Sequence, residues 1–107
     1  MDPGTPVVKV ELSQNADIDI TEIWIHNAER YSIEHADKYR DFLHEEMHKL
    51  TQLPELGRIA DSLPNLRYLV MKRRASGHGH VAYYEVRPGS IWVVRVLHTS
   101  MHAPDHI

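Results

Sequence analysis

The sequence contains no cysteine, which excludes a disulfide framework and a metal site built on thiolates. It also lacks any apolar run that approaches the roughly 18 residues needed to span a bilayer. The first six residues, Met1 to Pro6, have neither the basic nor the apolar region of a secretion signal. From these absences we expect a cytoplasmic protein.

A surplus of basic residues is missing as well. The chain has 12 Lys and Arg against 15 Asp and Glu, which gives a net charge of −3 with the histidines neutral. Proteins that hold a phosphate backbone usually show the opposite balance, because each neutralised phosphate requires a cationic side chain. We therefore do not expect nucleic-acid contacts to supply most of this protein's binding affinity, although the overall balance still allows a local basic patch.

The 107 residues, of which 42% are hydrophobic and 25% charged, suit one soluble globular domain with a modest core. We predict a single domain over 1–107, with flexible tails at 1–6 and 103–107. The alternation of residues 7–12 predicts a short strand. Ser13 and Ser32 stand where helix N-caps are expected, before helices predicted over 14–31 and 33–52. The inward faces are predicted to carry Ala16, Ile20, Ile23, Trp24 and Tyr31 on the first helix and Ala36, Tyr39, Leu43, Met47 and Leu50 on the second.

The second half of the chain is rich in strand-forming residues. The segment Pro54 to Arg58 is predicted to end the second helix, and 61–65 is predicted to be loop. Three strands are predicted, over 66–72, 79–86 and 91–97. The sequence Arg-Pro-Gly-Ser at 87–90 has the residue order of a type II turn and predicts a hairpin between the last two. The order β-α-α-β-β-β gives an α+β fold, with a helical hairpin on one face of a small antiparallel sheet.

Four segments together resemble a known family. Leu12-Ser13, followed by Ala16, Ile20 and Glu22-Ile23-Trp24, is similar to the opening of the first helix in ParE-type toxins of the ParE/RelE toxin superfamily. The junction Pro54 to Arg58 looks like the helix-to-sheet junction of the same family. Arg67 on the next strand and Arg95-Val96-Leu97-His98 on the last strand complete the resemblance, which covers about residues 7 to 102.

This resemblance implies a RelE-like fold and the role of toxin in a toxin–antitoxin pair that stabilises plasmids. The implied partner is a ParD-like antitoxin, with a ribbon-helix-helix DNA-binding half and a flexible tail that wraps the toxin. DNA would be contacted only indirectly through that antitoxin, and no membrane and no cofactor are implied. For the ParE branch the implied action is inhibition of DNA gyrase by binding rather than catalysis.

Candidate binding residues fall into two groups. The resemblance suggests that Arg95, His98, Met101 and His102 contact the target, although family members often carry an acidic residue near the last two. Ile18 and Ile25 lie seven residues apart, on the side of the first helix opposite its inward face, and Phe42 is a possible neighbour. A second apolar line usually indicates a second covered surface. We assign these three residues to antitoxin binding, with a homodimer, or isolated exposed side chains, as alternatives. The net negative charge suggests that the antitoxin tail brings some basic residues.

The alternative function is that of a RelE-type, ribosome-dependent mRNA endonuclease. Its catalytic groups would be Arg67, Arg95 and His98, which provide cations and a proton carrier for phosphate chemistry. Strand alternation places Arg95 on the open face of the sheet if Trp92 faces the helices. Alternatively, Arg95 has no catalytic role and forms an ion pair with a neighbouring carboxylate such as Glu85. A scaffold without toxicity is a third alternative.

The histidines suggest metal binding, but their arrangement argues against it. His44-Glu45-Glu46-Met47-His48 matches the H-E-x-x-H zinc motif. Met47 must face the core, however, which leaves the two histidines on the flank and Glu45 in solvent, without a third ligand or an enclosed cavity. His78, His80 and the C-terminal histidines are expected to be ordinary surface residues, since Pro104 prevents the latter from sharing one helix. No metal site is predicted.

Overall fold

The computed structural model describes residues 8–74, 77–101 and 103–107. A short strand, β1 (Lys9–Leu12), leads into two antiparallel helices, α1 (Gln14–Arg30) and α2 (Ile33–His48), and α2 continues into a 3₁₀ turn, Lys49–Thr51. Four strands follow, β2 (Arg58–Ala60), β3 (Leu63–Met71), β4 (His80–Arg87) and β5 (Ser90–His98), and a second 3₁₀ turn, Ala103–Asp105, lies near the C-terminus. None of the described helices is long and apolar enough to cross a membrane.

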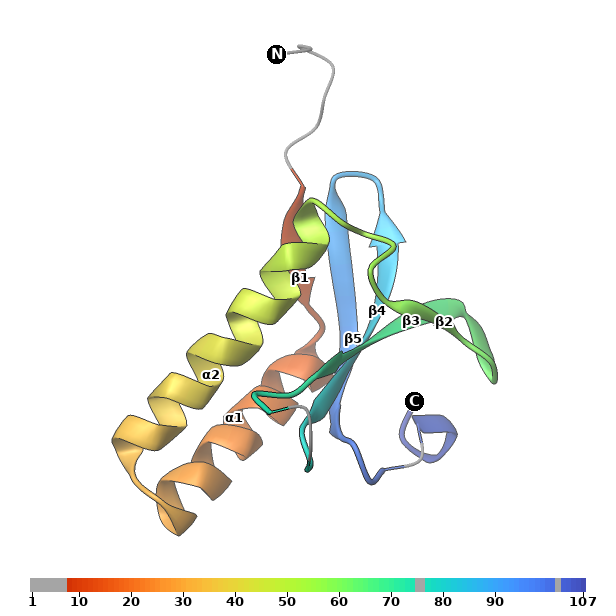
Figure 1. Cartoon of the computed structure of the whole chain (residues 1–107). Helices are drawn as coiled ribbons and strands as arrows, with labels where there is room; N and C mark the ends of the chain where they lie inside the picture. Colours follow the sequence, from red (N-terminus) through yellow and green to blue (C-terminus); the bar gives the residue numbers. More distant parts are fainter. Residues whose placement is uncertain (1–7, 75–76, 102) are drawn as a thin grey trace.

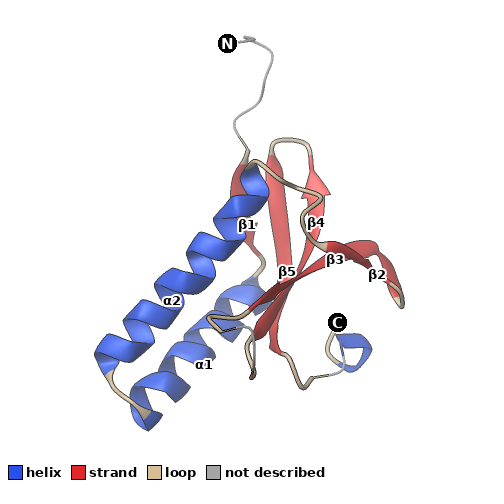
Figure 2. Cartoon of the chain, in the orientation of Figure 1, coloured by secondary structure: helices blue, strands red, loops and turns tan. Residues whose placement is uncertain are grey.

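The five strands form one sheet in the order β1-β5-β4-β3-β2. Figure 2 shows both helices on the same side of this sheet, so the predicted α+β class and helical hairpin are confirmed. The sheet is mixed, so the prediction of a wholly antiparallel sheet is wrong. β1 pairs in parallel with β5, whereas the other pairs are antiparallel. Gly89 has a φ of 74°, as the third position of a type II turn requires, and it closes the predicted β4–β5 hairpin.

Both predicted helix caps are present. The Ser13 hydroxyl accepts a hydrogen bond from the Ala16 amide at 3.0 Å, and the Ser32 hydroxyl accepts one from the His35 amide at 3.0 Å. Each cap satisfies one of the amides that have no partner in a first helical turn. The two serines therefore fix where the helices begin. Only Tyr31 and Ser32 lie between the end of α1 and the start of α2.

The core lies between the helical hairpin and the sheet. Most of the predicted inward residues are buried, but Tyr31 is 60% exposed because α1 ends before it. Trp24 is only half-buried, and its indole N–H donates to Asp37 Oδ1 at 2.9 Å. It therefore joins α1 to α2 and is not part of the buried core, contrary to its predicted place on the inward face. The core cluster consists of Ala16, Ile20, Leu43, Met47, Leu50, Met71, Ala82, Tyr84, Ile91, Val93 and Val96.

The junction after α2 is held by hydrogen bonds from the sheet. The Tyr84 hydroxyl accepts from the Gly57 amide at 2.9 Å and donates to the Pro54 carbonyl at 2.7 Å. An Arg67 N–H donates to the Gly57 carbonyl at 2.9 Å. The chain then enters β2, a strand that the sequence did not predict, and β3 begins at Leu63, inside the predicted loop.

Replacing Gly57 by alanine is expected to lower the free energy of unfolding by about 1–3 kcal/mol, as overpacking of a filled site does. A Cβ at this position would lie 2.5 Å from the Tyr84 hydroxyl and 2.7 Å from the Tyr68 carbonyl oxygen, which belongs to the backbone. Chemical denaturation of Gly57→Ala measures the loss. Glu55→Ala, an exposed change in the same junction, should stay within about 0.5 kcal/mol of wild type. Equal stability of the two variants would show that the junction tolerates the extra carbon.

Candidate functional site

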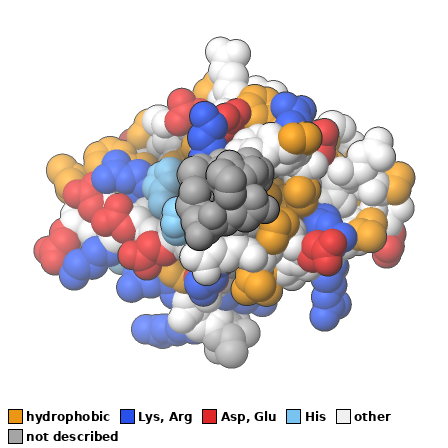
Figure 3. Space-filling model, turned by 90° about the horizontal axis from the view of Figure 1, so that it is seen from above, with side chains coloured by type: hydrophobic (Ala, Val, Ile, Leu, Met, Phe, Trp, Pro, Cys, Tyr) orange, Lys and Arg blue, Asp and Glu red, His pale blue; other side chains and the backbone are white. Residues whose placement is uncertain are grey.

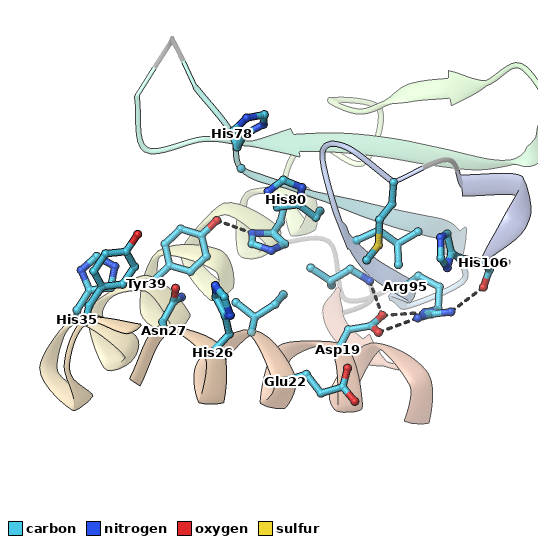
Figure 4. Close-up of a pocket in the computed structure, with 17 residues that line it drawn as sticks. Asp19, Glu22, His26, Asn27, His35, Tyr39, His78, His80, Arg95 and His106 are labelled. Atoms are coloured by element: carbon cyan, nitrogen blue, oxygen red, sulfur yellow. Dashed lines mark hydrogen bonds and ion pairs between the residues drawn. The ribbon is translucent and has the colours of Figure 1, made fainter. Parts of the chain in front are cut away.

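A groove of about 600 Å³ runs along α1, between that helix and the adjoining ends of β4 and β5. Figure 4 shows the side chains that line it, with Asp19, Glu22 and Arg95 towards one end and His35 and Tyr39 towards the other. The titratable residues of the lining are Asp19, Glu22, His26, Tyr31, His35, Tyr39, His78, His80, Arg95, His98 and His106. Six of the nine histidines of the chain line this groove, so it is the candidate site.

The groove exists because β1 is short. β1 pairs with β5 only as far as Leu12 opposite Val93. Beyond that point the edge of β5 is bonded by Ser13, the residue that precedes α1. The Ser13 amide donates to the Val93 carbonyl at 2.9 Å, and the Ser13 hydroxyl donates to the Val94 carbonyl at 2.6 Å. The register of β5 against β4 also shifts here, with an extra residue, Val94, between two consecutive pairs. Such a bulge redirects the side chains that follow it.

After this bulge, Arg95 reaches α1 and forms an ion pair with Asp19. Two guanidinium N–H groups donate to the two oxygens of the Asp19 carboxylate, each at 2.8 Å, and the Val96 amide adds a third bond at 2.9 Å. A further N–H of Arg95 donates to the His106 carbonyl at 2.6 Å. The hydrogen bonds to Asp19 raise the pKa of Arg95. The alternative that Arg95 pairs with a carboxylate is therefore confirmed, but the carboxylate is that of Asp19 and not that of Glu85, which lies 3.4 Å from Arg87.

Tyr39 and His80 form a second polar pair inside the groove. The Tyr39 hydroxyl and His80 Nδ1 are 2.6 Å apart. Burial raises the pKa of Tyr39 to about 12, so it remains a hydroxyl that can donate. Burial, together with the charges of His98 and His26, lowers the pKa of His80 to about 4, against the opposing effect of Asp19. His80 is thus a neutral acceptor at physiological pH.

His98 lies between two other histidines of the groove. Its ring centroid is 5.2 Å from that of His78 and 5.4 Å from that of His80. Its Nδ1 lies 2.7 Å from the Ser100 hydroxyl and accepts from the Ser100 amide at 3.1 Å. In the part of the chain that is described, no three His, Asp or Glu side chains are placed to hold a metal ion.

The family model for the ParE toxin of the type II toxin–antitoxin system parDE matches residues 10–103. This chain belongs to the ParE toxin family. Toxin ParE1 of Caulobacter vibrioides is 29% identical over 96 residues, which cover 90% of this chain and 94% of the relative. Toxin ParE1 of Mycobacterium tuberculosis H37Rv is 33% identical over 92 residues, covering 84% and 88%. A solved structure described as the chromosomal ParDE TA system from P. aeruginosa has the same fold, with a TM-score of 0.71 at 22% identity, and covers 87% of this chain and 95% of that one.

In this member of the ParE family, the residues that we assigned to antitoxin binding are only partly accessible. Ile18 and Ile25 are each 45% exposed, on the side of α1 away from the core. Phe42 is half-buried and packs against the core cluster. Its ring lies 5.7 Å from that of Tyr39. Only the two isoleucines therefore present the exposed apolar line that the spacing suggested.

Three of the residues assigned to target binding belong to one region. Arg95, His98 and Met101 all line the groove, and Met101 is 45% exposed. His102 lies outside the described residues. Arg67, the remaining member of the alternative nuclease set, is committed to the Gly57 carbonyl and does not line the groove. The structure therefore does not bring Arg67 together with Arg95 and His98.

The H-E-x-x-H motif lies on α2, where His44, Glu45 and His48 are exposed while Met47 is buried, as the helical spacing predicted. The groove residues that the sequence analysis missed are Asp19, Glu22, His26 and His35. Asp19 carried a usable signal, because it lies three residues after the buried Ala16 on the inward side of an amphipathic helix. A carboxylate at such a position requires a partner, but nothing in the sequence identifies that partner as Arg95.

Proposed function

We propose that this chain inhibits DNA gyrase by binding it in the cytoplasm, and that a ParD-like ribbon-helix-helix antitoxin neutralises it. Membership of the ParE toxin family, matched over residues 10–103, is the observation that carries the proposal. Under this proposal the toxin meets DNA only through its antitoxin. The absence of a basic surplus agrees with a protein target. Figure 3 shows acidic and basic side chains interspersed on the face seen from above, not a continuous basic face.

The positions of the arginines favour binding over RNA cleavage. A nuclease needs a free cation where negative charge develops on the phosphate. Arg67 donates to the Gly57 carbonyl and Arg95 is bound to Asp19 and to the His106 carbonyl. Both guanidinium groups thus have structural partners, and they belong to different regions of the sheet.

A supercoiling assay with purified gyrase and the purified chain tests the proposal. We expect loss of supercoiling at toxin concentrations where translating ribosomes show no mRNA cleavage. Met101→Asp, on the exposed end of the groove, should weaken gyrase inhibition by about tenfold or more, because a buried unpaired charge is costly at an interface. Val86→Asp changes an exposed apolar residue of β4 that does not line the groove and is the matched control. Rapid mRNA cleavage together with unchanged supercoiling would contradict gyrase inhibition and would support the endonuclease function instead.

We propose that the exposed line formed by Ile18 and Ile25 on α1 contributes to antitoxin binding, with Phe42 as a possible neighbour below the surface. The double variant Ile18→Asp, Ile25→Asp tests this by titration against the antitoxin. An unchanged affinity would remove this line from the antitoxin site. Conversion of a dimer into a monomer in the same variant would assign the line to a homodimer interface.

A further inference from the structure

Residues 103–107, here called the C-terminal turn, are held to β5 through Arg95. Within the turn, the His106 and Ile107 amides donate to the Ala103 carbonyl at 2.9 and 3.0 Å. Residues 104–107 are exposed, so apolar burial contributes little to holding the turn in place. Among the described residues, the bond from Arg95 to the His106 carbonyl at 2.6 Å is the one hydrogen bond that joins the turn to the rest of the chain.

Asp19 determines where this donor points. The Nε and Nη2 groups of Arg95 donate to the two oxygens of the Asp19 carboxylate, each at 2.8 Å. The Val96 amide holds the same carboxylate at 2.9 Å. A guanidinium group is planar and rigid, so two bonds fix its plane and the direction of its remaining donors. One of these, on Nη1, reaches the His106 carbonyl (Figure 4). A chain of contacts therefore runs from α1 through β5 to the C-terminal turn.

The same contacts leave Arg95 little to offer a partner molecule. Its side chain is 21% exposed, and three of its five N–H groups have acceptors within the chain. Met101, in contrast, is 45% exposed. Because Met101, His106 and Arg95 all line the groove, the place of the turn helps to shape the wall that carries Met101.

The chain after β5 is also anchored beside the start of β4. The Thr99 amide donates to the Gly79 carbonyl at 3.0 Å, and the Met101 amide donates to the His98 carbonyl at 2.9 Å. Met101 thus lies between this anchor and the one at Arg95. Loss of the Arg95 anchor would release the chain on the far side of Met101, and ordering that chain again would weaken any contact made there.

We propose that Arg95 is a positioning residue for the target contact, which holds the C-terminal turn against β5 and so presents Met101 to the target. Asp19 serves the same role one step removed, because it orients the guanidinium group. The inference rests on the proposed function and deepens it, since Arg95 then acts through its own chain and not by touching gyrase.

The first test measures the mobility of the turn in the isolated, full-length protein by NMR relaxation. Arg95→Lys keeps a cation beside Asp19 but lacks the planar fork that serves the carboxylate and the carbonyl together. We expect the order parameters of the His106 and Ile107 amides to fall from about 0.85 in wild type to below about 0.6. Arg87→Lys is the matched control, since Arg87 is exposed on β4 and does not line the groove, and it should resemble wild type.

A second variant breaks the same link without changing the ion pair. Proline has no backbone N–H, so His106→Pro removes the amide that closes the turn onto the Ala103 carbonyl. We expect the Ile107 amide to become as mobile in this variant as in Arg95→Lys. Circular dichroism verifies that every variant is folded.

Inhibition of supercoiling by purified gyrase then tests the role in binding. Arg95→Lys and His106→Pro should each raise the toxin concentration for half-inhibition by about tenfold, as loss of a hydrogen bond to a charged group does. The double variant should be no weaker than the weaker single variant, because both changes remove the same link. Arg87→Lys should inhibit as wild type does.

Equal order parameters in wild type and Arg95→Lys would overturn the inference, because the turn would not depend on Arg95. Effects that multiply in the double variant would overturn it in favour of direct contact between Arg95 and the target. Unchanged inhibition despite a mobile turn would remove the turn from target binding. Failure of wild type to inhibit gyrase would overturn the proposed function and this role with it, while the order parameters would still decide whether Arg95 holds the turn.

Discussion

Asp19→Ala is expected to lower the free energy of unfolding by about 3 kcal/mol, at the lower end of the range for breaking a buried ion pair. The substitution removes three hydrogen bonds at once, two from Arg95 and one from the Val96 amide. It leaves that amide without its partner on the edge of β5, and the guanidinium in a site where its side chain is only 21% exposed. Because Arg95 retains some access to water, the loss should not reach the upper end of the range. Urea denaturation followed by circular dichroism measures it.

Asp19→Asn removes the negative charge of residue 19 but keeps a side-chain oxygen that can accept hydrogen bonds. The asparagine carbonyl can still accept from the Val96 amide, so we expect the variant to retain about half of the lost stability. Glu22→Ala is the control, since Glu22 is an exposed carboxylate on the same helix and should change stability by less than about 0.5 kcal/mol. If Asp19→Ala and Glu22→Ala unfold at the same urea concentration, the Asp19–Arg95 pair contributes no net stability.

The sequence predicts local features of this fold well, because their causes are local. The caps at Ser13 and Ser32 depend on hydroxyl groups a few atoms from the amides that they satisfy, and the turn at Gly89 depends on the conformational freedom of one residue. The strand β2 was missed because a three-residue edge strand has no periodicity to detect. Its position is set by contacts from Tyr84 and Arg67, which lie far along the chain.

The candidate site was harder to predict because it depends on register. The alternation rule places Arg95 on a face of β5, but the bulge at Val94 redirects it, and no residue type in that segment marks a bulge. The groove likewise results from the end of β1 at Leu12, which leaves the edge of β5 to α1. The histidines were visible in the sequence, but their gathering on one side of α1 requires the tertiary structure.

Lowering the pH from 7 to 4 is expected to cost about 2–3 kcal/mol of stability through His80 alone. In the folded protein, burial lowers the pKa of His80 to about 4, whereas an unfolded histidine has a pKa of about 6.5. Between these values the unfolded chain binds the proton that the folded chain excludes. The stabilisation is thus complete above pH 6.5, is lost as the pH falls towards 4, and does not change further below it.

His80→Asn isolates this contribution, because its amide oxygen can still accept from the Tyr39 hydroxyl but does not titrate. Unfolding free energies of wild type and His80→Asn, measured by urea denaturation at several pH values from 7 to 4, should converge by about 2–3 kcal/mol as the pH falls. His44→Gln is the matched control, since His44 is exposed on α2 and its substitution should leave the pH profile of wild type unchanged. Parallel profiles for wild type and His80→Asn would show that His80 is already free to take up a proton in the folded protein. The Tyr39–His80 contact would then open well above pH 4, because a protonated ring cannot accept the Tyr39 hydrogen bond.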